Sequence, residues 1–176
     1  MSHLNVEIKA RCSNPASIRN YLLAANAVFK GEDLQTDTYF NVREGRLKLR
    51  EGNIENHLVY YERPDKTGPK NSRFHLLAIP DARTFKEVME KAVGIKTVVK
   101  KKREIYFIKN VKFHLDTIEG LGNFVEIEAG NLTADLPVEA LTEQCNFYVS
   151  ELKIQESDLL RVSYSDMIES IVNDNN

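Results

Sequence analysis

The chain has 176 residues, of which 42% are hydrophobic and 28% are charged, and its formal net charge is −2. This length and composition predict one globular domain over residues 1–176 with a substantial core, and we expect residues 173–176 to form a frayed tail. The net charge gives no general attraction to nucleic acid or to anionic membranes, so an anion site requires a local gathering of lysine and arginine.

The two cysteines, Cys12 and Cys145, lie far apart and lack the spacing of metal ligands. This argues against a disulfide framework or a zinc site. No apolar run approaches the ~20 residues of a membrane-spanning helix, and no charged-then-apolar leader precedes Asn5. We therefore expect a cytoplasmic protein without a membrane partner.

Strands interrupted by one helix are predicted for the first half of the chain. Asn14 and Pro15 supply an N-cap and a proline at the first helical position, for a helix that ends near Asn26. The proline-containing stretch 64–70 is predicted to be a loop. Elsewhere, alternating apolar and polar residues between turn-forming residues predict strands. These strands are residues 4–12, 27–40, 46–51, 57–63 and 72–79.

The second half of the chain adds three strands and further helices. Lys109-Asn110 forms a hairpin turn between two of the strands. Ser163 or Ser165 caps a short last helix that ends near Val172. The predicted strands are 96–108, 111–119 and 123–130, and the predicted helices before the last are 82–93 and 137–152. About eight strands and three or four helices make an α+β domain dominated by antiparallel sheet.

The predicted strands share an unusual property, since one face is apolar and the other carries ionic groups of both signs. The alternating ionic residues are Glu7, Lys9 and Arg11; Arg46, Lys48 and Arg50; Lys112, His114 and Asp116; and Glu126 and Glu128. A sheet with one solvated face explains any single pattern. Because the pattern recurs along the chain, we interpret it as the lining of a closed polar tunnel. Such a tunnel suits a polyanion held together with metal ions.

Glu126 and Glu128 are two residues apart, so both side chains project from one face of a strand. Two like charges so close are costly unless a cation neutralises them. Carboxylate oxygens suit Mg²⁺ or Mn²⁺, which gives the functional interpretation. For an isolated Glu-x-Glu, a solvated sheet face is the commoner explanation.

Arg46, Lys48 and Arg50 form one basic face, and Lys101 and Arg103 form another. A surface charge run is the usual explanation for each, and a nucleic-acid stripe is the alternative. The basic strands alternate in sequence with acidic ones, which would repel a phosphate backbone unless metal bridged the two. We therefore expect no nucleic-acid partner.

Other catalytic arrangements find little support in the sequence. Cys12 has no nearby histidine, and the chain has no glycine-rich phosphate loop. His57, His75 and His114 do not have the spacing of metal ligands. We expect them to be ordinary polar residues or part of the tunnel wall.

The order of these segments resembles the CYTH family, the triphosphate tunnel metalloenzymes, which include class IV adenylate cyclases and thiamine triphosphatases. The segments are Asn5-Val6-Glu7-Ile8-Lys9, Gly45-Arg46-Leu47-Lys48-Leu49-Arg50, Lys101-x-Arg103, His114-Leu115-Asp116 and Gly122-x-Phe124-Val125-Glu126-Ile127-Glu128. The resemblance covers about residues 3 to 168. Tyr60-Tyr61-Glu62-Arg63-Pro64 and Gly120-Leu121-Gly122 look most like the class IV adenylate cyclase branch.

The resemblance implies an α+β fold, in which eight antiparallel strands form a closed tunnel with helices packed on the outside. It also implies roles for individual residues. The residues that would bind the triphosphate are Lys9, Lys48, Arg50, Lys101 and Arg103, with Arg63 and Arg73 as additions. The residues that would hold Mg²⁺ or Mn²⁺ are Glu7, Asp116, Glu126 and Glu128. Glu7 and Lys9 would be the catalytic pair.

One departure from the family pattern lies at the N-terminus, where the signature is Glu-x-Glu-x-Lys and this chain has Asn5 in the first acidic place. An amide can ligate a metal, but it adds no charge and cannot act as a carboxylate base. The alternatives therefore include a sensor that binds a triphosphate without turnover. The enzymatic alternatives are conversion of ATP to cyclic AMP and pyrophosphate, and hydrolysis of inorganic, thiamine or nucleoside triphosphate. A homodimer stays an alternative to a monomer.

Overall fold

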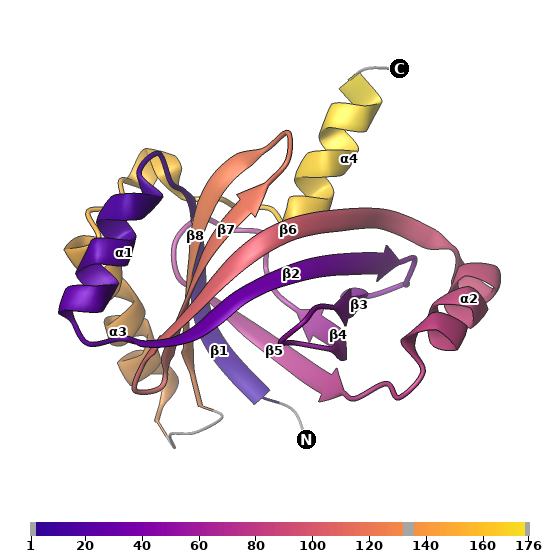
Figure 1. The fold of residues 1–176 in the computed structure, drawn as a ribbon, viewed down its shortest axis with the longest axis horizontal. Coiled ribbons are helices and arrows are strands. Elements are labelled where there is room, and N and C mark those ends of the chain that lie inside the picture. Colours follow the sequence, from indigo (N-terminus) through magenta and orange to yellow (C-terminus); the bar gives the residue numbers. More distant parts are fainter. Residues whose placement is uncertain (1–2, 132–135, 175–176) are drawn as a thin grey trace.

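The computed structural model describes residues 3–131 and 136–174. Eight antiparallel strands form a closed barrel in the order β1-β5-β4-β3-β2-β6-β7-β8, in which β8 pairs back with β1 (Figure 1). The strands are β1 His3–Arg11, β2 Val28–Phe40, β3 Arg46–Glu51, β4 His57–Glu62, β5 Lys70–Leu77, β6 Ile95–Ile108, β7 Val111–Ile118 and β8 Gly122–Gly130. The helices are α1 Pro15–Ala24, α2 Ala82–Val93, α3 Val138–Glu151, the 3-10 turn η1 Glu156–Asp158, and α4 Tyr164–Asp174. The expected antiparallel tunnel with outer helices is confirmed.

Most element ends differ from the prediction by one or two residues, and two of them are informative. β5 begins at Lys70, inside the predicted loop and ahead of the predicted strand 72–79, because Lys70 pairs with Glu7 of β1. α4 continues to Asp174, past the predicted end near Val172. Residues 175–176 of the predicted tail lie outside the described residues.

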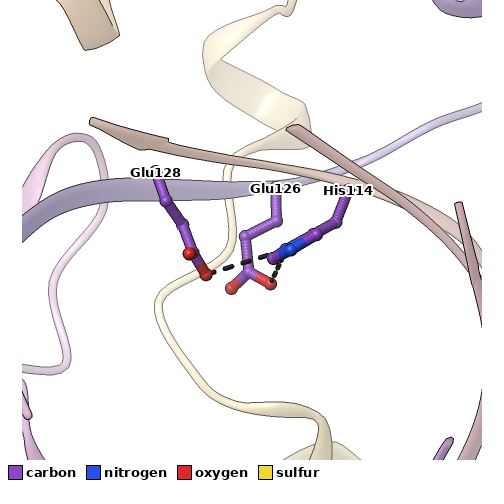
Figure 2. Close-up of side chains that lie close together, drawn as sticks. All are labelled: His114, Glu126 and Glu128. Atoms are coloured by element: carbon purple, nitrogen blue, oxygen red, sulfur yellow. Dashed lines mark hydrogen bonds and ion pairs between the residues drawn. The ribbon is translucent and has the colours of Figure 1, made fainter. Parts of the chain in front are cut away.

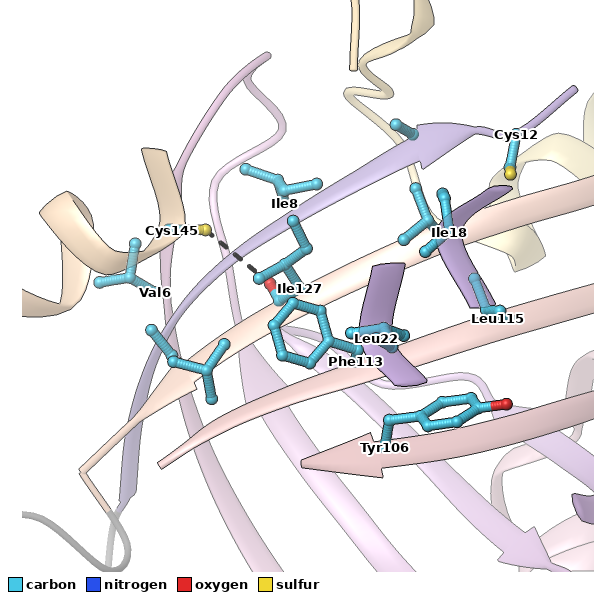
Figure 3. Packing of buried hydrophobic residues seen from close by; sticks show 14 of the residues in the cluster. Val6, Ile8, Cys12, Ile18, Leu22, Tyr106, Phe113, Leu115, Ile127 and Cys145 are labelled. Carbon is cyan, nitrogen blue, oxygen red and sulfur yellow. Dashed lines mark hydrogen bonds between the residues drawn. The ribbon is translucent and has the colours of Figure 1, made fainter. Parts of the chain in front are cut away.

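The main hydrophobic core lies outside the barrel. The apolar faces of β1, β7 and β8 point outward, where α1 and α3 cover them (Figures 1 and 3). Ile8, Phe113 and Ile127 are fully buried there, together with Leu22 of α1 and Leu141 of α3. Burial of each such side chain contributes about 1.5–3 kcal/mol. This arrangement leaves the inside of the barrel to the charged faces of the same strands.

The remaining helices cover other parts of the barrel. α2 begins after Asp81, whose side chain accepts a hydrogen bond from the backbone N–H of Thr84, and it ends at Gly94 with φ 80°. None of the residues of α2 is buried. α4 begins at Tyr164, which packs with Phe124 in a second, smaller core. No described helix is both long enough and apolar enough to cross a membrane.

Replacing Phe113 with alanine should test this placement of the core. Phe113 packs edge-to-face on Tyr148 of α3, with ring centroids 4.8 Å apart. Phe113→Ala should therefore lower the free energy of unfolding by about 3–5 kcal/mol, measured by urea denaturation, because a cavity opens between barrel and helix. Phe147→Ala is the control, since Phe147 is 56% exposed on the same helix. Equal losses in the two variants would contradict the outer core.

Candidate functional site

The inner faces of the strands enclose a cavity of about 320 Å³. Because the side-chain period of a strand is two, the outward apolar residues place their ionic neighbours inside. Most of the site residues expected from the sequence line this cavity. They are Glu7, Lys9, Lys48, Arg50, Arg63, Lys101, Arg103, Glu126 and Glu128.

Two expected residues, Arg73 and Asp116, do not line this cavity. Arg73 is exposed on β5 and lines a separate hollow together with Arg46, Arg63 and Lys96, whereas its neighbour Ser72 faces the cavity. Asp116 is buried, and its two carboxylate oxygens each accept a hydrogen bond of 2.6 Å from Arg103. The hydroxyl of Tyr164 also donates to Asp116, at 2.8 Å. Asp116 therefore holds Arg103 in place, and its expected metal role stays a prediction.

The basic wall of the cavity is organised around Asp37 of β2. Lys48 Nζ lies 3.0 Å and Lys101 Nζ 2.6 Å from Asp37 Oδ2. Arg50 donates from Nε and Nη2 to the two carboxylate oxygens, at 2.8 and 2.9 Å. Burial opposes ionisation of Asp37, but Arg50, Lys101 and Lys48 outweigh it and hold the pKa of this carboxyl well below its usual value. Burial lowers the pKa of Lys101, but Lys48 and Arg50 alone already outnumber the single charge of Asp37, so the wall keeps a positive excess.

Arg63, which follows β4, has unused hydrogen-bond donors. Its Nη1 donates to Glu7 Oε1 at 2.5 Å, and its side chain is only 3% exposed. Its Nε and Nη2 are buried and have no hydrogen-bond partner among the described residues. Buried donors are rarely left unpaired, because the loss of water is not compensated. These two nitrogens are therefore suited to an anionic ligand in the cavity.

Groups that suit a divalent cation gather on β7 and β8. His114 Nδ1 lies 3.2 Å from Glu126 Oε2 and 3.7 Å from Glu128 Oε1 (Figure 2). The Nε2 atom of His114 is buried and has no partner among the described residues. Glu7 faces Glu128 across the β1–β8 ladder, and Asn5 donates to Glu128 at 3.5 Å. Carboxylates with one imidazole fit Mg²⁺ and, because of the nitrogen, Mn²⁺.

Burial and neighbouring charges shift the pKa values of His114 and Glu128 in opposite directions. Burial, together with the charge of Glu126, raises the pKa of Glu128 to about 7. Burial, together with Arg103 and Lys112, lowers the pKa of His114 to about 3, so its imidazole is neutral and able to ligate a metal. At neutral pH a proton therefore competes with a cation for Glu128.

Sequence reasoning missed several residues of the cavity. Asp37 is not among the site residues expected from the sequence, although alternation within the predicted strand 27–40 places it on the same face as Gln35 and Tyr39. His114 was expected to be an ordinary wall residue, and the structure adds it to the acidic cluster. Glu55 comes from a turn between two strands, where no periodicity indicates the direction of a side chain.

A family model for the CYTH domain matches residues 3–164. The chain belongs to the CYTH domain family. Members of the CYTH family are adenylate cyclase-like or triphosphatase enzymes, and the family is metal-dependent and binds triphosphate substrates.

Relatives of this CYTH protein are similar to it over nearly its whole length. The candidate adenylate cyclase MJ0240 of Methanocaldococcus jannaschii is 27% identical over 177 residues, which cover 93% of this chain and 98% of the relative. The PH1012 protein of Pyrococcus horikoshii OT3 is 25% identical, covers 92% of this chain and 98% of its own, and superposes with a TM-score of 0.80. A Hippeastrum protein described as having a dominant triphosphatase activity shares the fold at 14% identity, with coverage of 96% and 95% and a TM-score of 0.61.

The raised pKa of Glu128 makes a prediction about stability and pH. The folded-state pKa, about 7, lies above the ordinary value of 4.5, so between these values the folded protein binds more protons than the unfolded chain. Without divalent metal, stability should therefore be lost as the pH rises from about 4.5 to 7. Glu128→Gln should stabilise the protein at pH 8 by about 2 kcal/mol and change little at pH 4.5.

Urea denaturation across this pH range measures the effect of Glu128→Gln. Glu119→Gln, which removes a carboxylate from an exposed position, is the control and should show no such pH dependence. A difference between Glu128→Gln and the unmodified protein that stays constant with pH would contradict the raised pKa of Glu128.

Proposed function

We propose that this CYTH protein is a metal-dependent enzyme that binds a triphosphate compound in the tunnel. Its leading reaction is the adenylate cyclase-like conversion of ATP to cyclic AMP and pyrophosphate. The observation that carries this proposal is Arg63, a buried guanidinium with two nitrogens that have no partner among the described residues, and it lines a cavity together with seven further lysines and arginines. Guanidinium donors and a positive excess are what phosphate oxygens require.

The residues of the basic wall would bind and orient the phosphates. Lys48, Arg50 and Lys101 are held in one cluster by Asp37, so little side-chain freedom is lost when a ligand binds. Arg103 is fixed by Asp116 in the same way. These cations are preorganised to stabilise the charge that develops on a leaving pyrophosphate.

The acidic wall would hold Mg²⁺ or Mn²⁺ through Glu126, Glu128 and His114, with Glu7 beside them. When bound, the cation supplies neutralisation of phosphate charge next to the carboxylates. In cyclisation the ribose 3′-hydroxyl attacks the α-phosphorus, the bond to the β-phosphate oxygen breaks, and pyrophosphate leaves. Glu7 would accept the hydroxyl proton, and Lys9, paired with Glu126 at 2.9 Å, would stabilise the phosphate charge.

The β4–β5 part of the cavity wall favours a substrate with an organic head group. Val59, Phe74 and Leu76 line the cavity there, next to the ring of Tyr61. An apolar wall offers nothing to a phosphate, but it can pack against a planar base or a thiazolium ring. This feature supports ATP or thiamine triphosphate over inorganic triphosphate.

Hydrolysis is the second candidate reaction, because it requires the same binding of the triphosphate by lysine and arginine side chains. Water would attack the terminal phosphorus, with Glu7 or Glu128 as the proton acceptor. Incubation with ATP, inorganic triphosphate and thiamine triphosphate, each with Mg²⁺ or Mn²⁺, separates the candidates by their products. Cyclic AMP with pyrophosphate identifies a cyclase, and orthophosphate identifies a phosphohydrolase. Binding without any product would instead support the sensor alternative.

The basic wall is tested by the double variant Lys48→Ala/Arg50→Ala. It should lower kcat/KM by about 100-fold or more, because the variant removes two donors fixed around Asp37. Lys86→Ala is the matched control, since Lys86 pairs with Glu51 outside the cavity, at 3.1 Å. Triphosphate binding and turnover that survive unchanged in the double variant would count decisively against the assignment.

The missing acidic residue at position 5 makes a prediction about metal binding. Asn5→Glu should tighten Mn²⁺ binding and raise turnover, because it places another carboxylate beside Glu128 in a partly desolvated site. Glu128→Ala should act in the opposite direction. Asn5→Gln is the control, since it lengthens the side chain without adding charge. Flat Mn²⁺ titrations for both Asn5→Glu and Glu128→Ala would exclude a metal site on this wall.

A further inference from the structure

The turn between β3 and β4, residues 52–56, carries one carboxylate, that of Glu55, into the tunnel. The turn wraps closely around Asp33, which is fully buried and accepts hydrogen bonds from the backbone N–H groups of Ile54 and Glu55, at 2.9 and 3.0 Å. At Gly52 an added Cβ atom would lie 2.6 Å from Asp33 Oδ1, so the approach leaves no room for a side chain. The turn therefore holds the backbone of Glu55 in a fixed position.

The side chain of Glu55 forms ion pairs with cations that face the cavity. Its Oε2 accepts hydrogen bonds from Arg50 Nη1 at 2.8 Å and from Gln35 Nε2 at 3.2 Å, and its Oε1 accepts one from Lys112. Burial opposes ionisation of Glu55, but Lys112 and Arg50 outweigh it and hold its pKa well below the usual value. The carboxylate therefore keeps its negative charge throughout the neutral range.

The position of Glu55 along the tunnel follows from the antiparallel order of the strands. The turn 52–56 lies at the end of the barrel where β3 ends, β4 begins and β7 begins. Lys112, the partner of Glu55, is followed along the inner face of β7 by His114 and then Asp116. The four residue steps from Lys112 to Asp116 span about 13 Å along the strand, and roughly 10 Å along the axis of the barrel because the strands are tilted. Only a short ionic stretch therefore lies on the inner side of Glu55.

The wall changes character on the other side of Glu55. Toward this end the cavity is lined by His57, which pairs with Arg50, by Leu76, and by Phe107, the partner of Lys112. Lys109 and Asn110 of the β6–β7 turn also line it, so apolar and uncharged polar groups mix there with a lysine. A phosphate group at this level would have to displace the Glu55 carboxylate from Arg50 and Lys112, and would meet its negative charge. A neutral or aromatic group meets no such opposition.

We propose that Glu55 ends the phosphate-binding stretch of the tunnel and so limits the number of consecutive phosphate groups that a ligand can place there. This inference rests on the proposed function and adds a residue that determines specificity. An extra phosphate would reach the fixed carboxylate, whereas the head group of a triphosphate can pass it. Glu55 thus selects triphosphates against longer phosphate chains.

The test compares the binding of inorganic pyrophosphate, triphosphate and tetraphosphate by isothermal titration calorimetry, without divalent metal so that no turnover occurs. The variant is Glu55→Gln, which removes the charge, keeps nearly the same shape and leaves the backbone hydrogen bonds to Asp33 intact. The control is Glu51→Gln, which removes a carboxylate that pairs with Lys86 outside the cavity. Thermal unfolding of each variant, with and without triphosphate, confirms that it is folded and binds.

The unmodified protein should prefer triphosphate to tetraphosphate. Glu55→Gln should raise the affinity for tetraphosphate relative to triphosphate by about tenfold or more, and Glu51→Gln should leave this ratio unchanged. An unchanged ratio in Glu55→Gln, whether the absolute affinities rise or fall, would overturn the inference and leave the proposed function standing. Equal binding of both chains by the unmodified protein would also overturn it. Failure of every phosphate compound to bind would overturn the inference and the proposed function together.

Discussion

Many charged groups can be buried in one cavity only when nearly every one has a partner of opposite sign, because desolvation of an unpaired ion costs several kcal/mol. The tunnel meets this constraint with carboxylates shared between cations. Asp37 serves Lys48, Arg50 and Lys101, and Arg103 joins Asp116 to Glu126. On the basic wall the cations outnumber the anions, and this excess positive charge is available to a ligand. The pairing that allows the charges to be buried therefore also favours an anionic ligand.

The closed barrel explains why the hydrophobic core lies outside. Closing the sheet removes its free edges and turns one face of every strand inward. Once the inner face is ionic, the apolar face must find its cover elsewhere, and α1 and α3 supply it over β1, β7 and β8. Ile8 and Lys9 illustrate the division, since both are buried although one faces the helices and the other faces Glu126. Stability and ligand binding thus depend on opposite faces of the same strands.

The strands and the shared face of their charged residues could be predicted from the sequence, because a period of two is a local property. The closed eight-stranded tunnel was implied by the resemblance to the CYTH family. Contacts across the barrel could not be predicted. The sequence does not indicate that Asp37 contacts Lys48, Arg50 and Lys101, because these contacts depend on the register of three strands. Glu55 could not be predicted, because the residues of a turn have no side-chain periodicity that would indicate its direction. Arg73 does not line the cavity, because Ser72 takes the inward position on β5 and its neighbour must point outward.

The contacts of Tyr164 close a ring of charges that spans the chain. Its hydroxyl donates to Asp116, Asp116 binds Arg103, Arg103 binds Glu126, and Glu126 pairs with Lys9, whose ammonium lies 3.7 Å from the centroid of the Tyr164 ring. Lys9 lies in the first strand and Tyr164 begins the last helix. The ring therefore cannot close during synthesis before Tyr164 has left the ribosome. Because Tyr164 and Lys9 both line the cavity, the cavity is complete only when the two ends of the chain have been joined.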